Sequence, residues 1–254
     1  MRPPVLLVVA HGSRDPRHAA TVHALVRRAG ELRPGLRMET AFLEFDTPSV
    51  PEALERLAAA GGGRADVVAL PLLLTRAFHA KSDLPGVLGE ASARLPGLRV
   101  RQARVLGPSP LLLAAVERRL REAGVRRSDR GSTGLVLAAA GSTDPEAIAA
   151  IAAMARELRR TGWCSVRPAF ASASLPRTED AVRSLRQDGC ARVAVAPYVI
   201  APGRLPDRIA EGARGADVLA GVLGPSPELA RLLLERYDAA AACAPAAARM
   251  GVLA

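Results

Sequence analysis

The sequence predicts an α/β protein made of two similar lobes, each with a mostly parallel four-stranded sheet covered by helices on both faces. Two observations support this fold class. Short apolar runs bounded by turn residues alternate with stretches of helical spacing, which is typical of parallel sheets. The same series of landmarks then occurs twice along the 254 residues, which indicates an internal duplication.

The first strand is expected at Val5–Ala10, an apolar run that stops at His11. Asp15 and Pro16 suit the start of a helix, as N-cap and first helical residue. His11 should therefore lie at the carboxyl end of the strand, where open α/β sheets bind ligands. The other elements expected in this half are helix Pro16–Leu32, strand Leu36–Leu43, helix Val50–Ala60, strand Val67–Leu74, helix Leu84–Leu95, strand Leu98–Ala103 and helix Ser109–Ala123.

A charged, Gly- and Ser-rich segment, Arg126–Gly134, is expected to be a linker, after which the pattern starts again. AHGSRDP at 10–16 matches AAGSTDP at 139–145, AFLEFDTP at 41–48 matches AFASASLP at 169–176, and VLGPSP occurs at both 105–110 and 222–227. We therefore expect two similar α/β lobes, at residues 1–125 and 134–254. From about Ala239 the chain is expected to continue as a helix or a frayed tail.

Composition narrows the classes of function. No apolar run reaches the roughly 18–20 residues of a membrane span. We also expect no signal peptide, because the sequence passes directly into the first predicted strand. Three widely spaced cysteines form no CxxC pair, so a zinc or iron–sulfur site is not indicated and a reducing cytoplasm is the expected location. The net charge of +10 reflects either a bias towards arginine or a polyanionic ligand. Aromatic residues make up only 3% of the chain, which argues against nucleic acid as that ligand.

The two halves differ in their polar groups. His11 corresponds to Ala140 and Glu44 to Ser172. His79 has no counterpart, because VALPLLLTRAFHAKSDLP in the first half is shortened to VAPYVIAPGRLP in the second. The turn residues are retained in both, as Gly12, Ser13, Asp15 and Pro16 and as Gly141, Ser142, Asp144 and Pro145. Three polar groups are thus confined to the first half.

These three groups should gather at the carboxyl edge of one sheet, because His11 and Glu44 end strands and His79 lies in the loop after the third. Two imidazoles and a carboxylate suit a borderline divalent metal, and also proton abstraction near neutral pH. Each residue alone could instead stabilise a turn, cap a helix or be solvated. His18 and His23 lie on different faces of one helix and are interpreted as solvated or rim side chains.

Ser13 is not interpreted as a nucleophile. The G-x-S-x-G elbow is absent, and Ser142 recurs in the half without the histidine, so a turn-stabilising role is favoured. The Gly-Ser turn could also hold a phosphate, although neither of the common phosphate-binding glycine motifs is present.

The segments LLVVAHGSRDP, FLE, PLLLTRAFHAKSDLP and LGPSP together resemble the sirohydrochlorin chelatases, the small class II chelatases. The resemblance covers nearly the whole chain in the tandemly duplicated form. It implies a chelatase-like fold of two flavodoxin-like lobes with a cleft between them, in which residues 1–125 form the catalytic lobe and residues 134–254 a degenerate repeat that forms the other wall. It also implies insertion of Fe²⁺, Co²⁺ or Ni²⁺ into a reduced tetrapyrrole. It also implies that His11, Glu44 and His79 bind the metal, that His11 and His79 are catalytic, and that the metal is a substrate with no organic cofactor.

The substrate implied by the resemblance, sirohydrochlorin, is an octacarboxylate, which gives the positive charge a role. Arg14 and Arg76 flank the two histidine segments and are the first candidates for binding carboxylates, followed by Lys81 and Ser13. Iron insertion for sirohaem is favoured, with cobalt insertion for cobalamin as the alternative. A metal or tetrapyrrole carrier, and a hydrolase like the histidine phosphatases, are further alternatives. In the latter family an arginine precedes the histidine, whereas Ala10 does so here. The duplication suggests that a monomer suffices.

Overall fold

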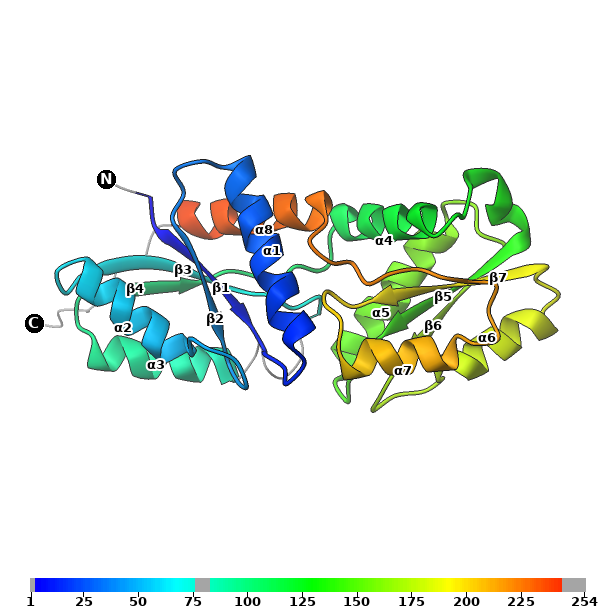
Figure 1. The fold of residues 1–254 in the computed structure, drawn as a ribbon, viewed down its shortest axis with the longest axis horizontal. Helices are drawn as coiled ribbons and strands as arrows, with labels where there is room; N and C mark the ends of the chain where they lie inside the picture. The colour runs from blue at the N-terminus through cyan, green and yellow to red at the C-terminus, as the bar shows by residue number, and fades with distance from the viewer. Residues whose placement is uncertain (1–2, 76–82, 244–254) are drawn as a thin grey trace, which may run out of the picture.

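A computed structural model describes residues 3–75 and 83–243 of the chain. They form two lobes side by side along the long axis of the molecule, each built on a four-stranded parallel sheet (Figure 1). This confirms the predicted fold class. None of the helices in these two ranges combines the length and the apolar character that a membrane span needs.

The first lobe contains the elements that the sequence predicts, with small differences at their ends. Its sheet has the order β2-β1-β3-β4. The elements are β1 (Val5–Ala10), α1 (Pro16–Leu32), β2 (Met38–Phe42), α2 (Val50–Ala60), β3 (Ala65–Pro71), α3 (Leu84–Arg94), β4 (Leu98–Gln102) and α4 (Pro110–Glu122). β3 ends three residues before the apolar run does, because the chain bends there and the Leu73 N–H donates to the carbonyl oxygen of Pro71 at 2.9 Å.

The second lobe repeats this plan, with the sheet order β6-β5-β7-β8. A 3₁₀ turn, η2 (Arg127–Ser132), connects the lobes. The elements that follow are β5 (Thr133–Ala139), α5 (Pro145–Arg159), β6 (Ser165–Phe170), α6 (Thr178–Gln187), β7 (Arg192–Tyr198), α7 (Arg204–Gly212), β8 (Val218–Leu219) and α8 (Pro227–Ala242).

β1 is buried on both faces, as expected for a central parallel strand. Successive side chains of a strand point to opposite faces. Leu6 and Val8 therefore join the core under α1 and α8, whereas Leu7 and Val9 join the core under α2 and α3. β2 pairs with one edge of β1, and β3 pairs with the other edge. The carboxyl end of β1 is thus the position at which doubly wound sheets bind ligands.

The last helix of each half packs on the other half. α8 lies against α1, β3 and β4 of the first lobe, and α4 lies against β7 and α5 of the second (Figure 1). Each helix also binds the opposite VLGPSP loop through an arginine: Arg119 donates to the Leu223 carbonyl oxygen, and Arg236 donates to the carbonyl oxygens of Val105 and Leu106. One hydrophobic core consequently runs through both lobes.

The segment between the lobes is packed against the protein, although its composition predicts a linker. Arg130 is 9% exposed and donates to the Glu117 carboxylate at 3.0 Å and to the Thr161 carbonyl oxygen at 3.1 Å. Its guanidinium also lies 5.3 Å from the centre of the Trp163 ring. These contacts fix the segment between α4 and the end of α5.

Candidate functional site

The turn after β1 brings His11 next to Glu44 along the backbone. The Glu44 N–H donates to the His11 carbonyl oxygen at 2.8 Å. Gly12 has a φ of +96°, and a Cβ atom there would lie 1.7 Å from the Glu44 carbonyl oxygen. Only glycine permits this approach, so the residue after His11 fixes the packing of the two strand ends.

Hydrogen bonds within the turn hold its shape and start α1. The Ser13 hydroxyl oxygen accepts the Asp15 N–H at 3.1 Å, and Asp15 accepts the Arg17 N–H at 2.9 Å as N-cap. The hydrogen bond from the Arg17 side chain also holds the pKa of Asp15 below its ordinary value. Ser13 thus has the turn-stabilising role that the sequence favours, and Asp15 is the predicted cap.

The second lobe has the same turn without the histidine. Gly141 has a φ of +97°, and a Cβ atom there would lie 1.9 Å from the Ser172 carbonyl oxygen. The Ser142 hydroxyl oxygen accepts the Asp144 N–H at 3.0 Å, as Ser13 does for Asp15. The conformation of the turn is therefore independent of the residue at the position of His11.

Asp46, in the loop after β2, is a further polar residue that differs between the two halves of the sequence. Its Oδ2 accepts the Ser13 N–H at 3.0 Å, which ties the His11 turn to the loop after β2. The second lobe has Ser174 at this position, and that side chain instead donates to the Ser142 carbonyl oxygen. The carboxylate of Asp46 is therefore confined to the first half, in addition to the three groups identified from the sequence.

Phe45 is a second residue at the site that the sequence analysis did not identify. It adopts a positive φ of 65° and is 56% exposed. Its ring is edge-on to the His11 imidazole, with the centres 6.3 Å apart, and the Arg14 guanidinium lies 5.2 Å from the ring centre. An exposed aromatic ring between a histidine and an arginine provides an apolar surface beside the site.

The structure brings together part of the predicted metal-binding set. His11 is half-buried and Glu44 is exposed, on adjacent strand ends. His79, together with Arg76 and Lys81, lies outside the described residues. Among residues 3–75 and 83–243, no group of three His, Cys, Asp or Glu side chains is arranged to hold a metal ion. The complete set thus remains a prediction that depends on His79.

The other two histidines occupy different environments. His23 is exposed and lies edge-on to the Phe42 ring at 5.8 Å. His18 is half-buried, and its Nδ1 is enclosed without a hydrogen-bond partner in the described part of the chain. Burial lowers the pKa of His18, and the neighbouring Asp46 carboxylate opposes this shift in part. His18 is therefore not fully solvated, and the charges of Asp46 and His11 influence its pKa.

The second lobe contacts the His11 turn through the start of α7. A Cβ atom at Gly203 would lie 3.9 Å from the Ser13 Oγ. Arg17, in the first turn of α1, donates to the Asp207 carboxylate in the first turn of α7 at 2.8 Å. These contacts place lobe 2 directly beside the turn that carries His11.

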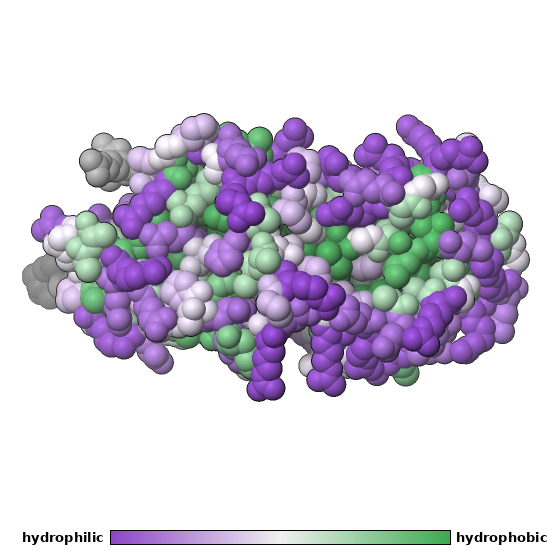
Figure 2. Space-filling model, in the orientation of Figure 1, coloured by the Kyte–Doolittle hydropathy of each residue, from purple (hydrophilic) through white to green (hydrophobic). Residues whose placement is uncertain are grey.

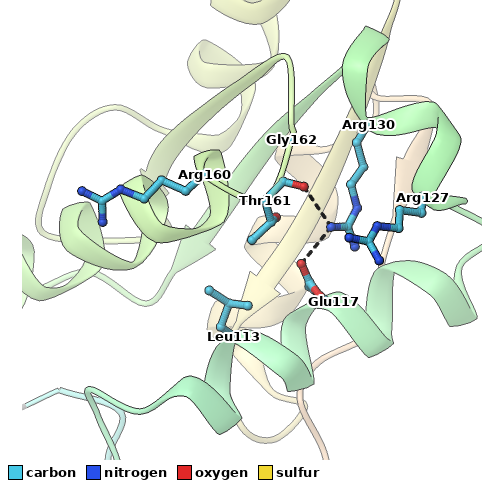
Figure 3. Close-up of a pocket in the computed structure, with 7 residues that line it drawn as sticks. All are labelled: Leu113, Glu117, Arg127, Arg130, Arg160, Thr161 and Gly162. Carbon is cyan, nitrogen blue, oxygen red and sulfur yellow. Dashed lines mark hydrogen bonds and ion pairs between the residues drawn. The ribbon is translucent and has the colours of Figure 1, made fainter.

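A cavity of about 470 Å³ lies in another part of the molecule, between α4, η2 and the end of α5 (Figure 3). Its lining includes Arg130, Glu117 and Thr161, and these residues satisfy one another by hydrogen bonds. Arg160 points away from this group in the same view. We assign no ligand to this cavity.

The fold and the site thus define a two-lobed α/β protein with an imidazole and a carboxylate at the carboxyl edge of its first sheet. A model of the CbiX family matches residues 5–123 and again residues 134–240. The chain therefore belongs to the CbiX family, and the two separate matches agree with the internal duplication.

Two named relatives match most of this chain. The sirohydrochlorin cobaltochelatase of Priestia megaterium is 27% identical over 243 residues, which cover 92% of this chain and 78% of that protein. The sirohydrochlorin ferrochelatase of Bacillus subtilis is 26% identical over 80% of this chain and 77% of that protein. The structure of SirB from Bacillus subtilis with Fe³⁺ matches with a TM-score of 0.80 and 24% identity, covering 94% of this chain and 96% of that one. This structural match supports the fold.

Proposed function

We propose that this protein inserts a divalent metal ion into sirohydrochlorin. The observation that carries the proposal is the difference between the two turns. A CbiX-family chain holds the same turn twice, and only the first copy pairs an imidazole with a carboxylate, at His11 and Glu44. The relatives named above for this chemistry, one with cobalt and one with iron, support the substrate.

The metal is a substrate, and we propose that His11, Glu44 and His79 hold it in passing. Imidazole and carboxylate donors accept both Fe²⁺ and Co²⁺. Glu44 is exposed, so it can meet an ion that arrives with part of its water shell. Few ligands and an open site favour release of the ion, whereas a closed four-ligand cage would retain it.

Metal insertion also requires the loss of two pyrrole protons and a distortion of the ring. His11 and His79 are the proposed proton acceptors, because imidazole titrates near neutral pH. Phe45 offers an apolar face beside His11, on which part of a flat macrocycle can rest. Binding energy from the periphery of the ring then contributes to its distortion.

The carboxylates of the substrate need cationic and N–H donors. We propose Arg14, Arg76, Lys81 and Ser13 for this role in the first lobe. Arg14 is exposed at the turn and stacks over Phe45, so its outer guanidinium nitrogens can reach a ligand above that ring. The Ser13 oxygen already accepts the Asp15 N–H, which leaves its O–H available as a donor.

We propose iron as the metal, for sirohaem synthesis, with cobalt for cobalamin synthesis as the alternative. The donor set does not discriminate between the two ions, and the relatives include both activities.

A multiple-turnover assay tests the proposal. Purified protein is mixed with an excess of metal-free sirohydrochlorin and either Fe²⁺ or Co²⁺ without oxygen, and the absorbance change is followed against the uncatalysed rate. We expect many turnovers per protein molecule, and the ratio of kcat/KM for the two ions identifies the metal. A single stoichiometric uptake would instead identify a carrier. Metal-free hydrolysis of p-nitrophenyl phosphate would identify a phosphatase.

A further inference from the structure

The start of α7 faces the turn that carries His11 and Ser13. Gly203 approaches the Ser13 hydroxyl, and Asp207 forms an ion pair with Arg17 at 2.8 Å. Arg204 is the first residue of α7 and lies between Gly203 and Asp207 in the sequence. A side chain that projects into solvent from the start of α7 lies at the junction of the two lobes, beside the proposed site.

The two lobes begin their corresponding helices with different chemistry. In the first lobe Ser49 caps α2 with a full capping box. In the second lobe Arg177 holds this position before α6, and its side chain makes no capping hydrogen bond. Asp83 precedes Leu-Pro at α3, where it is the N-cap but makes no side-chain capping hydrogen bond, whereas Arg204, the first residue of α7 after its N-cap Gly203, precedes Leu-Pro there.

These substitutions do not benefit the helices. Ser and Asp are favoured at helix starts, and a cation there is opposed by the helix dipole. α6 and α7 follow β6 and β7, so both arginines lie at the carboxyl edge of the second sheet. Lobe 2 thus has two cations at the edge where lobe 1 has residues suited to helix starts.

Neither arginine is used by the described part of the protein. Arg204 is exposed, and its side chain takes part in no hydrogen bond or ion pair within residues 3–75 and 83–243. Arg177 is half-buried, and its Nη1 is enclosed without an acceptor in the same ranges. A cationic nitrogen enclosed without an acceptor is costly, so the described part of the protein does not explain why an arginine stands at this position.

We propose that Arg204, together with Arg177, binds carboxylates of the tetrapyrrole from the second lobe. The inference rests on the proposed function, because it concerns the same substrate. Guanidinium groups bind carboxylates with two parallel hydrogen bonds, which suits a ring with acidic groups around its rim. Long hydrophilic side chains project on both sides of the junction between the lobes at the lower edge of the molecule (Figure 2). Lobe 2 has lost the metal-binding groups and has gained groups that hold the ring.

Steady-state insertion kinetics with sirohydrochlorin as the varied substrate test this assignment. Arg204→Gln is expected to raise KM for sirohydrochlorin about tenfold with kcat within about twofold of the wild type, and Arg177→Gln to act in the same direction. Arg204→Lys should recover part of the loss, because it keeps the charge without the fork of nitrogens. Arg214→Gln is the matched control, since this exposed arginine lies just beyond the other end of α7, and its KM should be unchanged.

Two outcomes would overturn the inference. One is an Arg204→Gln protein that inserts metal with the KM of the wild type. The other is an equal rise in KM for Arg204→Gln and Arg214→Gln, which would reflect net charge alone. Thermal unfolding of each variant separates a loss of folding from a loss of binding. Failure of the wild-type protein to turn over would refute the proposed function itself, so the two failures are distinguishable.

Discussion

The turns after β1 and β5 have nearly the same backbone and carry different side chains. Gly12 and Gly141 have φ values of +96° and +97°, and each lies against the carbonyl oxygen of the residue that follows the next strand by two positions, Glu44 or Ser172. One turn presents a histidine and the other an alanine. Because the same backbone accommodates either residue, the turn has a structural role in both lobes. We therefore expect that His11 can be replaced without loss of folding stability. Under the two proposals above, the lobes divide their tasks: the first carries the metal-binding groups and part of the carboxylate-binding set, and the second adds further arginines for the substrate.

The largest effect is expected from His11→Ala. Metal insertion should fall by at least about a hundredfold, because the variant removes a proposed metal ligand and proton acceptor. The thermal unfolding midpoint should stay near that of the wild type, since Ala140 already occupies the equivalent turn. Ala140→His is the reciprocal control and should leave the insertion rate unchanged. His18→Ala and His23→Ala should retain most of the activity.

A substitution of the shared glycine tests the scaffold in both lobes. Gly12→Ala and Gly141→Ala should each lower the free energy of unfolding by more than about 2 kcal/mol, because the new Cβ collides with a backbone carbonyl at a positive φ. Urea unfolding measures this loss. Gly12→Ala should also lower kcat, whereas the folded Gly141→Ala protein should keep it. Ready tolerance of either alanine would contradict the close approach seen in both turns.

Asp46→Ser makes the first turn resemble the second. The variant loses a carboxylate that accepts the Ser13 N–H, so we expect a loss of about 1–2 kcal/mol in unfolding free energy and a several-fold lower kcat. Ser174→Ala removes the corresponding side chain of lobe 2 and should lower stability without lowering kcat. Equal kinetic effects of the two variants would argue that Asp46 is not a positioning residue for His11.

A smaller effect is expected from the half-buried His18. Burial lowers its pKa in the folded state, so the unfolded chain binds the proton more tightly. The folded protein should therefore lose stability as the pH falls below about 6.5, the ordinary pKa of histidine. His18→Gln should flatten this part of the stability profile. If the dependence of stability on pH is the same in the His18 variant as in the wild type, burial of this imidazole does not cause the loss of stability at low pH.

The sequence predicts elements best where local chemistry sets their ends. Pro16–Leu32 and Val50–Ala60 are found as predicted, because Asp15 and Ser49 cap them. β3 ends early, since its apolar run continues into a buried bend that the pattern does not distinguish from a strand. The packing of α8 on the first lobe and of α4 on the second is not predictable from the spacing of apolar residues, because the apolar face of a helix does not specify which sheet the helix covers.

The site was predicted in part, for a similar reason. His11 and Glu44 follow apolar runs, and parallel topology brings strand ends together. Asp46 was visible as a difference between AFLEFDTP and AFASASLP but follows the strand by four residues, so its backbone hydrogen bond needed the structure. The contact of Gly203 with Ser13 depends on how two lobes pack, which no local pattern encodes.

A binding titration tests the division of tasks most directly. Metal-free sirohydrochlorin is titrated onto the wild type, His11→Ala and Arg204→Gln, and its absorbance or fluorescence gives Kd. We predict that His11→Ala binds the tetrapyrrole as tightly as the wild type although it cannot insert metal, and that Arg204→Gln binds about tenfold more weakly. Weak binding by His11→Ala together with unchanged binding by Arg204→Gln would contradict the account.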